Sequence, residues 1–259
     1  MTHRPRKRFG QHFLTDDFII NQIISDIAPK PTDNLIEIGP GLGAITEPLI
    51  KQCQKLTVIE LDRDVIPPLT RRCEPHGDLT VVQADAMKID LSTLRRTNEP
   101  MRIVGNLPYN ISTPILFHLL EYRSQIIDMH FMLQKEVVDR LCASPGNKDY
   151  GRLSVMVQRF CDTTYLFDVP PECFDPPPKV NSAVLRITPF TNSPYPPIDN
   201  ALFATVVNLA FQQRRKTLRN ALKRLITEKT FEAAGVDPQS RAEQLSVDDF
   251  VNICINHVE

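Results

Sequence analysis

The chain has 259 residues, of which 42% are hydrophobic, and this is enough for one large domain or for one large and one small domain. The formal net charge is −1, so any basic surface that binds nucleic acid has to be local. The six cysteines form no CxxC pair, which argues against a metal site and against a disulfide scaffold and predicts reduced thiols.

The basic N-terminal stretch MTHRPRKRFGQHFLTDDF lacks the apolar core of a secretory signal. No segment approaches the roughly 20 apolar residues that a membrane-spanning helix needs. We therefore expect a cytoplasmic protein that has no membrane partner and binds no metal.

Strands and helices are predicted to alternate over the first half of the chain. A helix capped by Thr15 comes first, and β-branched strands then alternate with helices. The strands are expected at 34–39, 56–61, 79–83, 101–105 and 127–133, and the helices near 43–51, 63–72, 91–96 and 112–122. This alternation predicts an α/β fold with a parallel sheet that is covered on both faces.

The pattern changes after the fifth strand. Two more strands, at 162–169 and 182–188, are expected to complete the sheet, and the proline-rich stretch 188–199 predicts a linker. Helices are expected beyond it at 199–211, at 215–226 and, capped by Ser246, at 247–257. We therefore predict two domains, residues 1–189 and residues 190–259.

A glycine-rich loop follows the first predicted strand. In EIGPGLGA, Gly39, Gly41 and Gly43 permit a tight turn and let a ligand approach the backbone closely. The spacing differs from the GxGxxG of dinucleotide-binding loops because position 44 is Ala. The loop therefore favours a nucleoside ligand without a pyrophosphate, and the alternative is a turn that binds nothing.

Acidic side chains stand at the ends of the next two strands. Glu60 is placed to accept hydrogen bonds from both hydroxyls of a ribose, and Asp85 to accept one from the exocyclic amine of an adenine. Each acid can instead be a solvated loop residue or a helix cap. Because open parallel sheets bind ligands at the carboxyl ends of their strands, the two acids and the glycine loop together favour a nucleoside site.

The fourth strand runs into VGNLPYNIS (104–112). The exocyclic amine of adenine is a poor nucleophile, since its lone pair is delocalised into the ring. The side-chain oxygen of Asn106 and the carbonyl of Leu107, restricted by Pro108, are candidate acceptors for the two N–H groups. Tyr109 offers a face on which the base can stack. The loop therefore predicts activation of an adenine amine, and the alternative is a turn in which Asn106 binds its own backbone.

Together these blocks resemble the S-adenosylmethionine-dependent rRNA adenine N6-dimethyltransferases. The resemblance is greatest to the bacterial small-subunit branch, the kasugamycin-sensitivity dimethyltransferase family. The blocks span nearly the whole chain: RKRFGQHFL (6–14), EIGPGLGAIT (37–46), VIELD (58–62), VQADAM (82–87), GNLPYNIST (105–113), MLQKEVVDRL (132–141), YGRLSV (150–155), FDPPPKVNSAV (174–184) and LAFQQRRKTLRNAL (209–222). The resemblance implies a Rossmann-like class I methyltransferase sheet of seven strands and a small all-helical C-terminal domain.

The resemblance also implies an activity. S-adenosylmethionine is the expected cofactor, and two methyl groups are expected on each of two adjacent adenosines near the 3′ end of 16S rRNA, late in assembly of the 30S subunit. It implies a catalytic loop of Asn106, Leu107 and Tyr109. Phe174 is expected to pack on the target base opposite Tyr109, and the alternative for Phe174 is a core position. The implied cofactor pocket contains His12 (Asn in many relatives), Leu14, Gly39, Glu60, Asp85 and Asn106, and we add Gly41 from the same loop.

Two basic clusters flank these blocks. The first contains Arg4, Arg6, Lys7 and Arg8, and the second contains Arg214, Arg215, Lys216, Arg219, Lys223 and Arg224. At helical spacing, Arg215, Arg219 and Lys223 share one face. The clusters predict phosphate contacts with 16S rRNA in an immature 30S subunit, bound by a monomer, and the alternative is a solvated surface.

Other functions fit the sequence less well. A resistance-type methyltransferase of large-subunit rRNA shares the glycine loop and the NLPY turn, but the blocks at 132–141 and 174–184 favour the small-subunit enzyme. An rRNA-binding assembly factor with dispensable catalysis would not need Glu60 and Asn106. DNA adenine methyltransferases usually have Asp where this chain has Asn106, and Ala44 disfavours an NAD enzyme.

Overall fold

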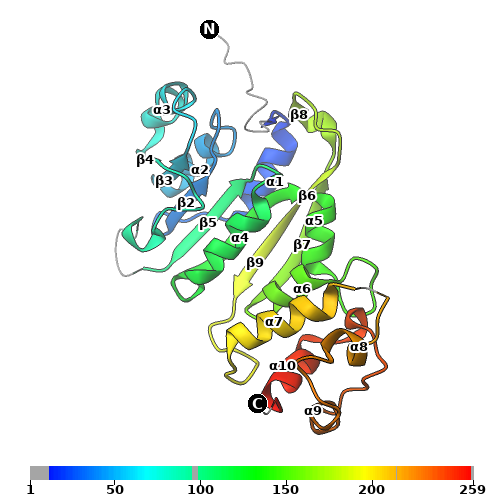
Figure 1. Cartoon of the computed structure of the whole chain (residues 1–259). Coiled ribbons are helices and arrows are strands. Elements are labelled where there is room, and N and C mark those ends of the chain that lie inside the picture. The colour runs from blue at the N-terminus through cyan, green and yellow to red at the C-terminus, as the bar shows by residue number, and fades with distance from the viewer. Residues whose placement is uncertain (1–11, 95–98, 214, 258–259) are drawn as a thin grey trace. The chain divides into compact units, whose positions relative to one another are not determined.

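The computed structural model describes residues 12–94, 99–213 and 215–257 (Figure 1). The chain divides into two compact units. The first contains Met1–Val138 and Thr164–Pro189, and the second contains Asp139–Thr163 and Phe190–Glu259.

The first unit is built on a seven-stranded sheet with the strand order β4-β3-β2-β5-β6-β9-β7. The strands are β2 (Asn34–Ile38), β3 (Lys55–Glu60), β4 (Asp78–Gln83), β5 (Met101–Asn106), β6 (Ile126–Gln134), β7 (Cys161–Val169) and β9 (Ser182–Pro189). From β4 to β6 along this order, each adjacent pair of strands is parallel, which confirms the predicted α/β fold.

The sheet is mixed rather than wholly parallel, because β9 runs antiparallel to β6. A parallel neighbour would need a long crossover, usually a helix, to lead into the strand. Strand β9 lies between β6 and β7 in the sheet and follows β7 in the chain. The segment between β7 and β9 contains only the 3₁₀ turn η5 (Pro171–Cys173) and the short strand β8 (Phe174–Asp175), so no helical crossover leads into β9. The prediction of a parallel sheet is therefore wrong at this edge.

Within the described residues, the first unit has one helix before the seven-stranded sheet begins and further helices after four of its strands. They are α1 (Asp17–Ile27), α2 (Thr46–Cys53), α3 (Ile66–Cys73), α4 (Ser112–Glu121) and the start of α5 (Lys135–Cys142). The cap of α1 is Asp16 rather than Thr15, since the Asp16 side chain accepts a hydrogen bond from the Ile19 amide. In place of the helix expected at 91–96, the described residues form the 3₁₀ turn η3 (Leu91–Leu94).

A separate two-stranded sheet lies at the start of the chain. Strand β1 (Phe13–Leu14) pairs antiparallel with β8, so that Phe13 stands opposite Asp175 and Leu14 opposite Phe174. The Thr15 hydroxyl and amide both donate to the Cys173 carbonyl. These contacts hold the N-terminal segment beside the loop that follows β7, a juxtaposition that no local sequence pattern predicted.

The second unit is helical around its own core. Its helices are α6 (Arg152–Gln158), α7 (Asn200–Phe211), α8 (Leu218–Leu222), α9 (Glu228–Ala234) and α10 (Val247–Ile255). Ser246 and Asp249 form the predicted capping box of α10. Tyr150 and Val155 pack into this core beside Phe203 and Phe250, so residues 139–163, which the sequence analysis assigned to the first domain, belong to this unit.

Within the described part of the chain, none of the helices combines the length and the apolar character needed to cross a bilayer.

Candidate active site

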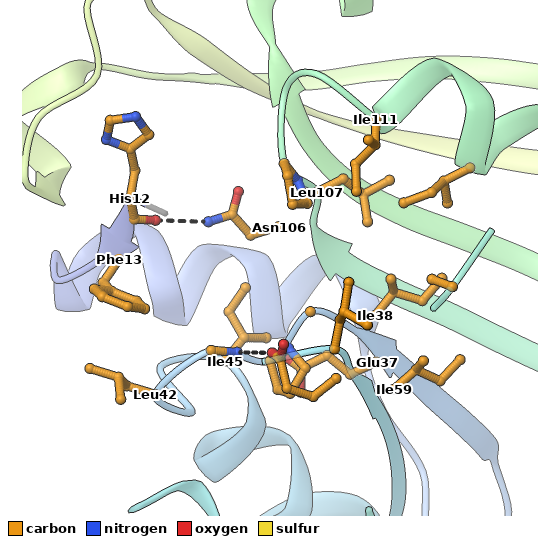
Figure 2. A pocket seen from close by; sticks show the side chains of 18 of the residues that line it. His12, Phe13, Glu37, Ile38, Leu42, Ile45, Ile59, Asn106, Leu107 and Ile111 are labelled. Atoms are coloured by element: carbon orange, nitrogen blue, oxygen red, sulfur yellow. Dashed lines mark hydrogen bonds between the residues drawn. The ribbon is translucent and has the colours of Figure 1, made fainter. Parts of the chain in front are cut away.

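A cavity of about 380 Å³ opens at the carboxyl ends of β2, β3, β4 and β5 (Figure 2). This is the edge at which open parallel sheets bind ligands, and the volume suits a nucleoside-sized molecule. Nine of the predicted site residues line the cavity: His12, Leu14, Gly39, Gly41, Glu60, Asp85, Asn106, Leu107 and Tyr109. The structure thus brings most of the predicted set together.

The glycine loop lies against the end of β5 and against β1. Gly39 and Gly41 have φ angles of +67° and +54°, which only glycine adopts readily. A Cβ atom on Gly41 would lie 3.2 Å from the Phe13 ring, and one on Gly39 would lie 3.8 Å from the Asn106 carbonyl oxygen. Glycine at these two positions therefore lets the loop turn tightly, and at Gly41 it also avoids a tight contact with Phe13.

Glu60 ends β3 and is held by the backbone. Its Oε2 accepts a hydrogen bond from the Gly41 amide at 3.3 Å, and its Oε1 accepts one from the Asp62 amide at 2.7 Å. Burial raises the pKa of Glu60, and these backbone donors oppose that rise. The carboxylate is therefore fixed at the rim of the cavity and has lone pairs left for a ligand.

Glu37 lines the cavity at the end of β2, and the sequence analysis gave it no role. Its side chain is only 1% exposed. Burial raises the pKa of Glu37 to about 8, and the Glu60 charge raises it further. Among the described residues, none donates a hydrogen bond to Glu37 Oε2. A buried acceptor without a partner is unfavourable, so this oxygen fits a donor group of a ligand.

Asp85 lines the cavity just beyond β4. Its Oδ1 accepts a hydrogen bond from the Met87 amide at 3.0 Å, and its Oδ2 lies 3.8 Å from Lys88 Nζ. Asp85 therefore caps the turn, as the alternative interpretation expected, and it also faces the cavity, as the ligand-binding interpretation expected.

Asn106 is anchored through its amide nitrogen. Nδ2 donates to the His12 carbonyl oxygen at 3.3 Å, as Figure 2 shows. Since a carbonyl can only accept, this bond assigns the nitrogen to that side and leaves Oδ1 free to accept. Leu107 follows with its amide donating to the Met132 carbonyl at 3.2 Å, which fixes the start of the loop on β6.

The Tyr109 ring forms a wall of the cavity. It stacks on the His12 ring, with centroids 5.9 Å apart and an angle of 24° between the planes. His12 Nδ1 lies 2.7 Å from the Pro176 carbonyl oxygen, and Tyr109 Oη lies 2.7 Å from Ser182 Oγ. The ring is therefore held by two residues far apart in the chain, His12 and Ser182, and His12 is itself held by Pro176.

Phe174 does not line the cavity. Its side chain is 3% exposed and packs in the core of the first unit with Leu14, Val169 and Cys173. The antiparallel pairing of β1 and β8 sets Phe174 opposite Leu14 and turns it into that core. The structure thus shows the alternative core position, and contact between Phe174 and a target base stays a prediction.

The predicted RNA-contacting residues are only partly described. Arg4, Arg6, Lys7, Arg8 and Arg214 lie outside the described residues. Arg215, Lys216, Arg219, Lys223 and Arg224 are exposed.

Arg215, Arg219 and Lys223 do not share one helical face, because α8 spans only Leu218–Leu222. Arg215 comes before α8, and Lys223 is the residue after its end. At the start of this helix Leu218 is buried, and its amide donates to the Ser240 carbonyl. Arg219 also forms an ion pair with Glu228, with Nε 2.7 Å from Oε1. RNA contact by these residues stays a prediction.

Ser182 and Gly105 also support the site, and the sequence analysis missed them. A Cβ atom on Gly105 would lie 2.5 Å from the Ile38 carbonyl oxygen, so glycine lets β5 approach β2 beside Asn106. Glycine inside a predicted strand is the signal that can reveal such an approach. No comparable local signal marks Ser182.

The residues that the structure describes include no cluster of His, Cys, Asp or Glu side chains suited to a metal ion. None of the six cysteines forms a disulfide.

Comparison with known proteins identifies relatives over almost the whole chain. The family model described as "Ribosomal RNA adenine dimethylase" matches residues 2–257. The chain is 54% identical over 250 residues to "Ribosomal RNA small subunit methyltransferase A" of Acinetobacter baylyi, covering 96% of this chain and 91% of that protein. It is 55% identical over 251 residues to the protein of the same name from Saccharophagus degradans, covering 97% and 94% of the two chains.

Solved structures resemble this one as well. A dimethyladenosine transferase from Plasmodium falciparum superimposes with a TM-score of 0.82 and 26% identity, covering 94% of this chain and 96% of that one. The 23S rRNA methyltransferase ErmE superimposes with a TM-score of 0.73 and 24% identity, covering 95% and 99%. The second likeness shows a shared fold.

Proposed function

The chain belongs to the ribosomal RNA adenine dimethylase family and is an rRNA adenine N6,N6-dimethyltransferase, and we propose that it acts on two adjacent adenosines near the 3′ end of 16S rRNA. We propose S-adenosylmethionine as the methyl donor and an immature 30S subunit as the substrate, bound by a monomer in the cytoplasm. One observation carries this proposal: Glu60, Asp85 and Asn106 lie at or just beyond the carboxyl ends of β3, β4 and β5, around one cavity that Tyr109 also lines.

The residues around the glycine loop fit S-adenosylmethionine. The Glu60 carboxylate can accept from the ribose hydroxyls, and Asp85 from the adenine amine. The unpartnered Glu37 Oε2 fits the ammonium group of the methionine part. When bound, S-adenosylmethionine supplies a methyl group on a positively charged sulfur. The glycine loop allows the ligand to approach the backbone of β2.

Asn106 and Leu107 prepare the target nitrogen in this proposal. With Nδ2 bound to the His12 carbonyl, Asn106 presents Oδ1 as an acceptor. The Leu107 carbonyl, restricted by Pro108, is the second acceptor. Acceptors on both N–H groups favour a pyramidal nitrogen whose lone pair is released from the ring. Because these acceptors are already oriented, they stabilise positive charge that develops on N6 only in the transition state.

Tyr109 holds the base in this proposal. An adenine that is unstacked from RNA loses stacking energy, and an aromatic wall in the cavity restores part of it. After methyl transfer, the cationic N6 is acidic enough to lose its proton to water, so the site needs no dedicated general base. A second methyl transfer needs the same acceptor geometry with one N–H remaining.

Relatives that are 54% and 55% identical carry a small-subunit name, and this favours 16S rRNA over the large-subunit alternative. The likeness to ErmE, at 24% identity, concerns the fold. The presence of Glu60, Asp85 and Asn106 in one cavity argues for retained catalysis rather than for an assembly factor without turnover.

The test is to incubate the protein with S-adenosylmethionine labelled in the methyl group and with 30S subunits from cells that lack this modification. Mapping of the labelled nucleotides should find N6,N6-dimethyladenosine at two adjacent positions near the 3′ end of 16S rRNA. Deproteinised 23S rRNA and fully methylated 30S subunits serve as controls. Label in 23S rRNA, or none in 16S rRNA, would contradict the proposal.

A further inference from the structure

We propose that Ser182 is a positioning residue for methyl transfer, because its hydroxyl ties the Tyr109 ring to the central sheet in the orientation that receives the target adenine. The inference rests on the proposed function, in which Tyr109 faces the base. It adds a residue to which neither the sequence motifs nor the lining of the cavity assigns a role.

Ser182 offers a rigid anchor. It is the first residue of β9, pairs with Gln134 at the end of β6, and is fully buried at 0% exposure. Next to it, the Asn181 carbonyl accepts a hydrogen bond from the Lys135 amide at 2.9 Å. The hydroxyl is thus fixed by backbone pairing on an inner strand of the sheet, and it lies 2.7 Å from Tyr109 Oη.

Tyr109 stands on a loop and needs such an anchor. Its main chain is held by Ser112, whose hydroxyl donates to the Tyr109 carbonyl at 3.3 Å, and by the turn in which the Ile111 amide donates to the Pro108 carbonyl. These bonds fix the base of the side chain and leave the ring free to rotate. The bond to Ser182 fixes its far end, so that both ends together define one ring orientation.

The other ring contact of Tyr109 comes from the N-terminal segment. His12 stacks on the ring but precedes the two-residue strand β1 and is tied to the Pro176 carbonyl. An adenine entering against that face has to share it with, or displace, the His12 ring. The bond to Ser182 lies at the hydroxyl end and leaves the ring face free, so it can hold Tyr109 throughout base entry.

A packing role for Ser182 makes a different prediction. If β9 only required a small side chain there, alanine would serve as well and the phenol hydroxyl would be irrelevant. If the hydroxyl pair orients the ring, removal of either hydroxyl leaves the other without its partner, fully buried at Ser182 and half-buried at Tyr109, and releases the ring. Removal of both then has little further effect, because no unpaired group remains.

The test is a double-mutant cycle of Ser182→Ala, Tyr109→Phe and the double variant. We expect each single change to lower kcat/KM for 30S subunits by about tenfold and the double change to lower it no further. The dissociation constant for S-adenosylmethionine should stay within about twofold in all three, because no cofactor contact is removed. Ser182→Thr keeps the hydroxyl and should restore most activity. Ser154→Ala, which removes another fully buried hydroxyl in the second unit, is the matched control.

Independent losses that multiply in the double variant would overturn the inference, and so would wild-type activity of Ser182→Ala. If Ser182→Ala melts below the assay temperature, Tyr109→Phe and Ser182→Thr decide the question, since a fully active Tyr109→Phe enzyme contradicts a role for the hydroxyl pair. Failure of the wild-type protein to label 16S rRNA would instead contradict the proposed function, so the two failures are distinguishable.

Discussion

Two halves of one cavity are built in different ways. The cofactor half contains Glu37, the glycine loop and Glu60, and the base half contains Asn106, Tyr109 and His12. In the cofactor half, Glu60 is bound by the amides of Gly41 and Asp62, which lie 19 and 2 positions away. In the base half, hydrogen bonds join residues 73, 94 and 164 positions apart.

The cofactor half is therefore formed mainly by contacts within one part of the chain, and the base half by contacts between distant parts. A strand, a glycine turn and an acid at the next strand end fix the cofactor half almost as soon as β2 and β3 pair. The base half becomes complete only when the N-terminal segment, the loop after β5 and strand β9 have come together. The cofactor half should therefore tolerate changes in the base half, whereas catalysis depends on both.

The largest effect is expected from Asn106→Ala. Loss of one oriented acceptor should lower the rate of methyl transfer by roughly 10²- to 10³-fold, as loss of one oriented donor does in other enzymes. The affinity for S-adenosylmethionine should stay within a few-fold, because Glu37, Glu60 and the glycine loop are unchanged. Single-turnover rates and equilibrium binding of the cofactor measure the two halves separately. Equal losses of methyl-transfer rate and of cofactor affinity would contradict the assignment of Asn106 to the base half.

The converse change is Glu60→Gln. An amide keeps the size of the side chain but removes the charge and places N–H groups against the Gly41 or Asp62 amide. We expect the dissociation constant for S-adenosylmethionine to rise by roughly 10- to 100-fold. The rate at saturating cofactor should remain near that of the wild type. Glu121→Gln, an exposed carboxylate on α4, is the control. A lower rate at saturating cofactor with an unchanged dissociation constant would contradict the assignment of Glu60 to the cofactor half.

The sequence predicted the cofactor half better for a physical reason. Glu60 and Asp85 were found because a parallel sheet directs its strand ends to one edge, and Asn106 was found by the same rule. Glu37 was visible in the same motif, but its importance comes from burial, which depends on the packed sheet. Local periodicity locates a strand end and leaves the partners of a side chain unspecified.

What the sequence left open or missed depends on tertiary contacts. The core position of Phe174, one of the two interpretations given for it, follows from its pairing with Leu14, and Ser182 acquires a partner through the position of β9. The helix expected at 215–226 spans only Leu218–Leu222, and Leu218 is buried in the helical core. In each case the outcome depends on packing against residues far away in the chain.

A smaller effect concerns the stability of the cofactor half. Because burial raises the pKa of Glu37 from 4.5 to about 8, the folded protein keeps a proton that the unfolded chain releases. The stability gained in this way is complete below about pH 4.5 and is lost as the pH rises to about 8. Glu37→Gln stays neutral and should escape this loss.

Thermal melting of the two proteins from pH 5 to pH 8.5 measures the difference. The melting temperatures should nearly coincide at pH 5, and Glu37→Gln should melt about 5 °C higher near pH 8. Cofactor affinity should fall in the same variant, which would show that Glu37 contributes to cofactor binding although its burial lowers stability at high pH. Parallel melting curves across the pH range would contradict this account of Glu37.

The smallest effect is expected outside both halves, in the second unit. If Arg215 contacts an RNA phosphate, Arg215→Ala should weaken binding and reduce the slope of log K against log salt by about 0.7 to 0.9, the value for one released counterion. Arg219→Ala should change the slope less, because Glu228 already pairs with that guanidinium.

Filter binding of 30S subunits at several salt concentrations measures these slopes, and the affinity for S-adenosylmethionine and the single-turnover rate of bound complexes should not change. Equal slopes for the two variants would mean that RNA displaces Glu228 from Arg219. An unchanged slope for Arg215→Ala would assign that side chain to the solvated surface. A change in the single-turnover rate would show that residues beyond the cavity take part in methyl transfer.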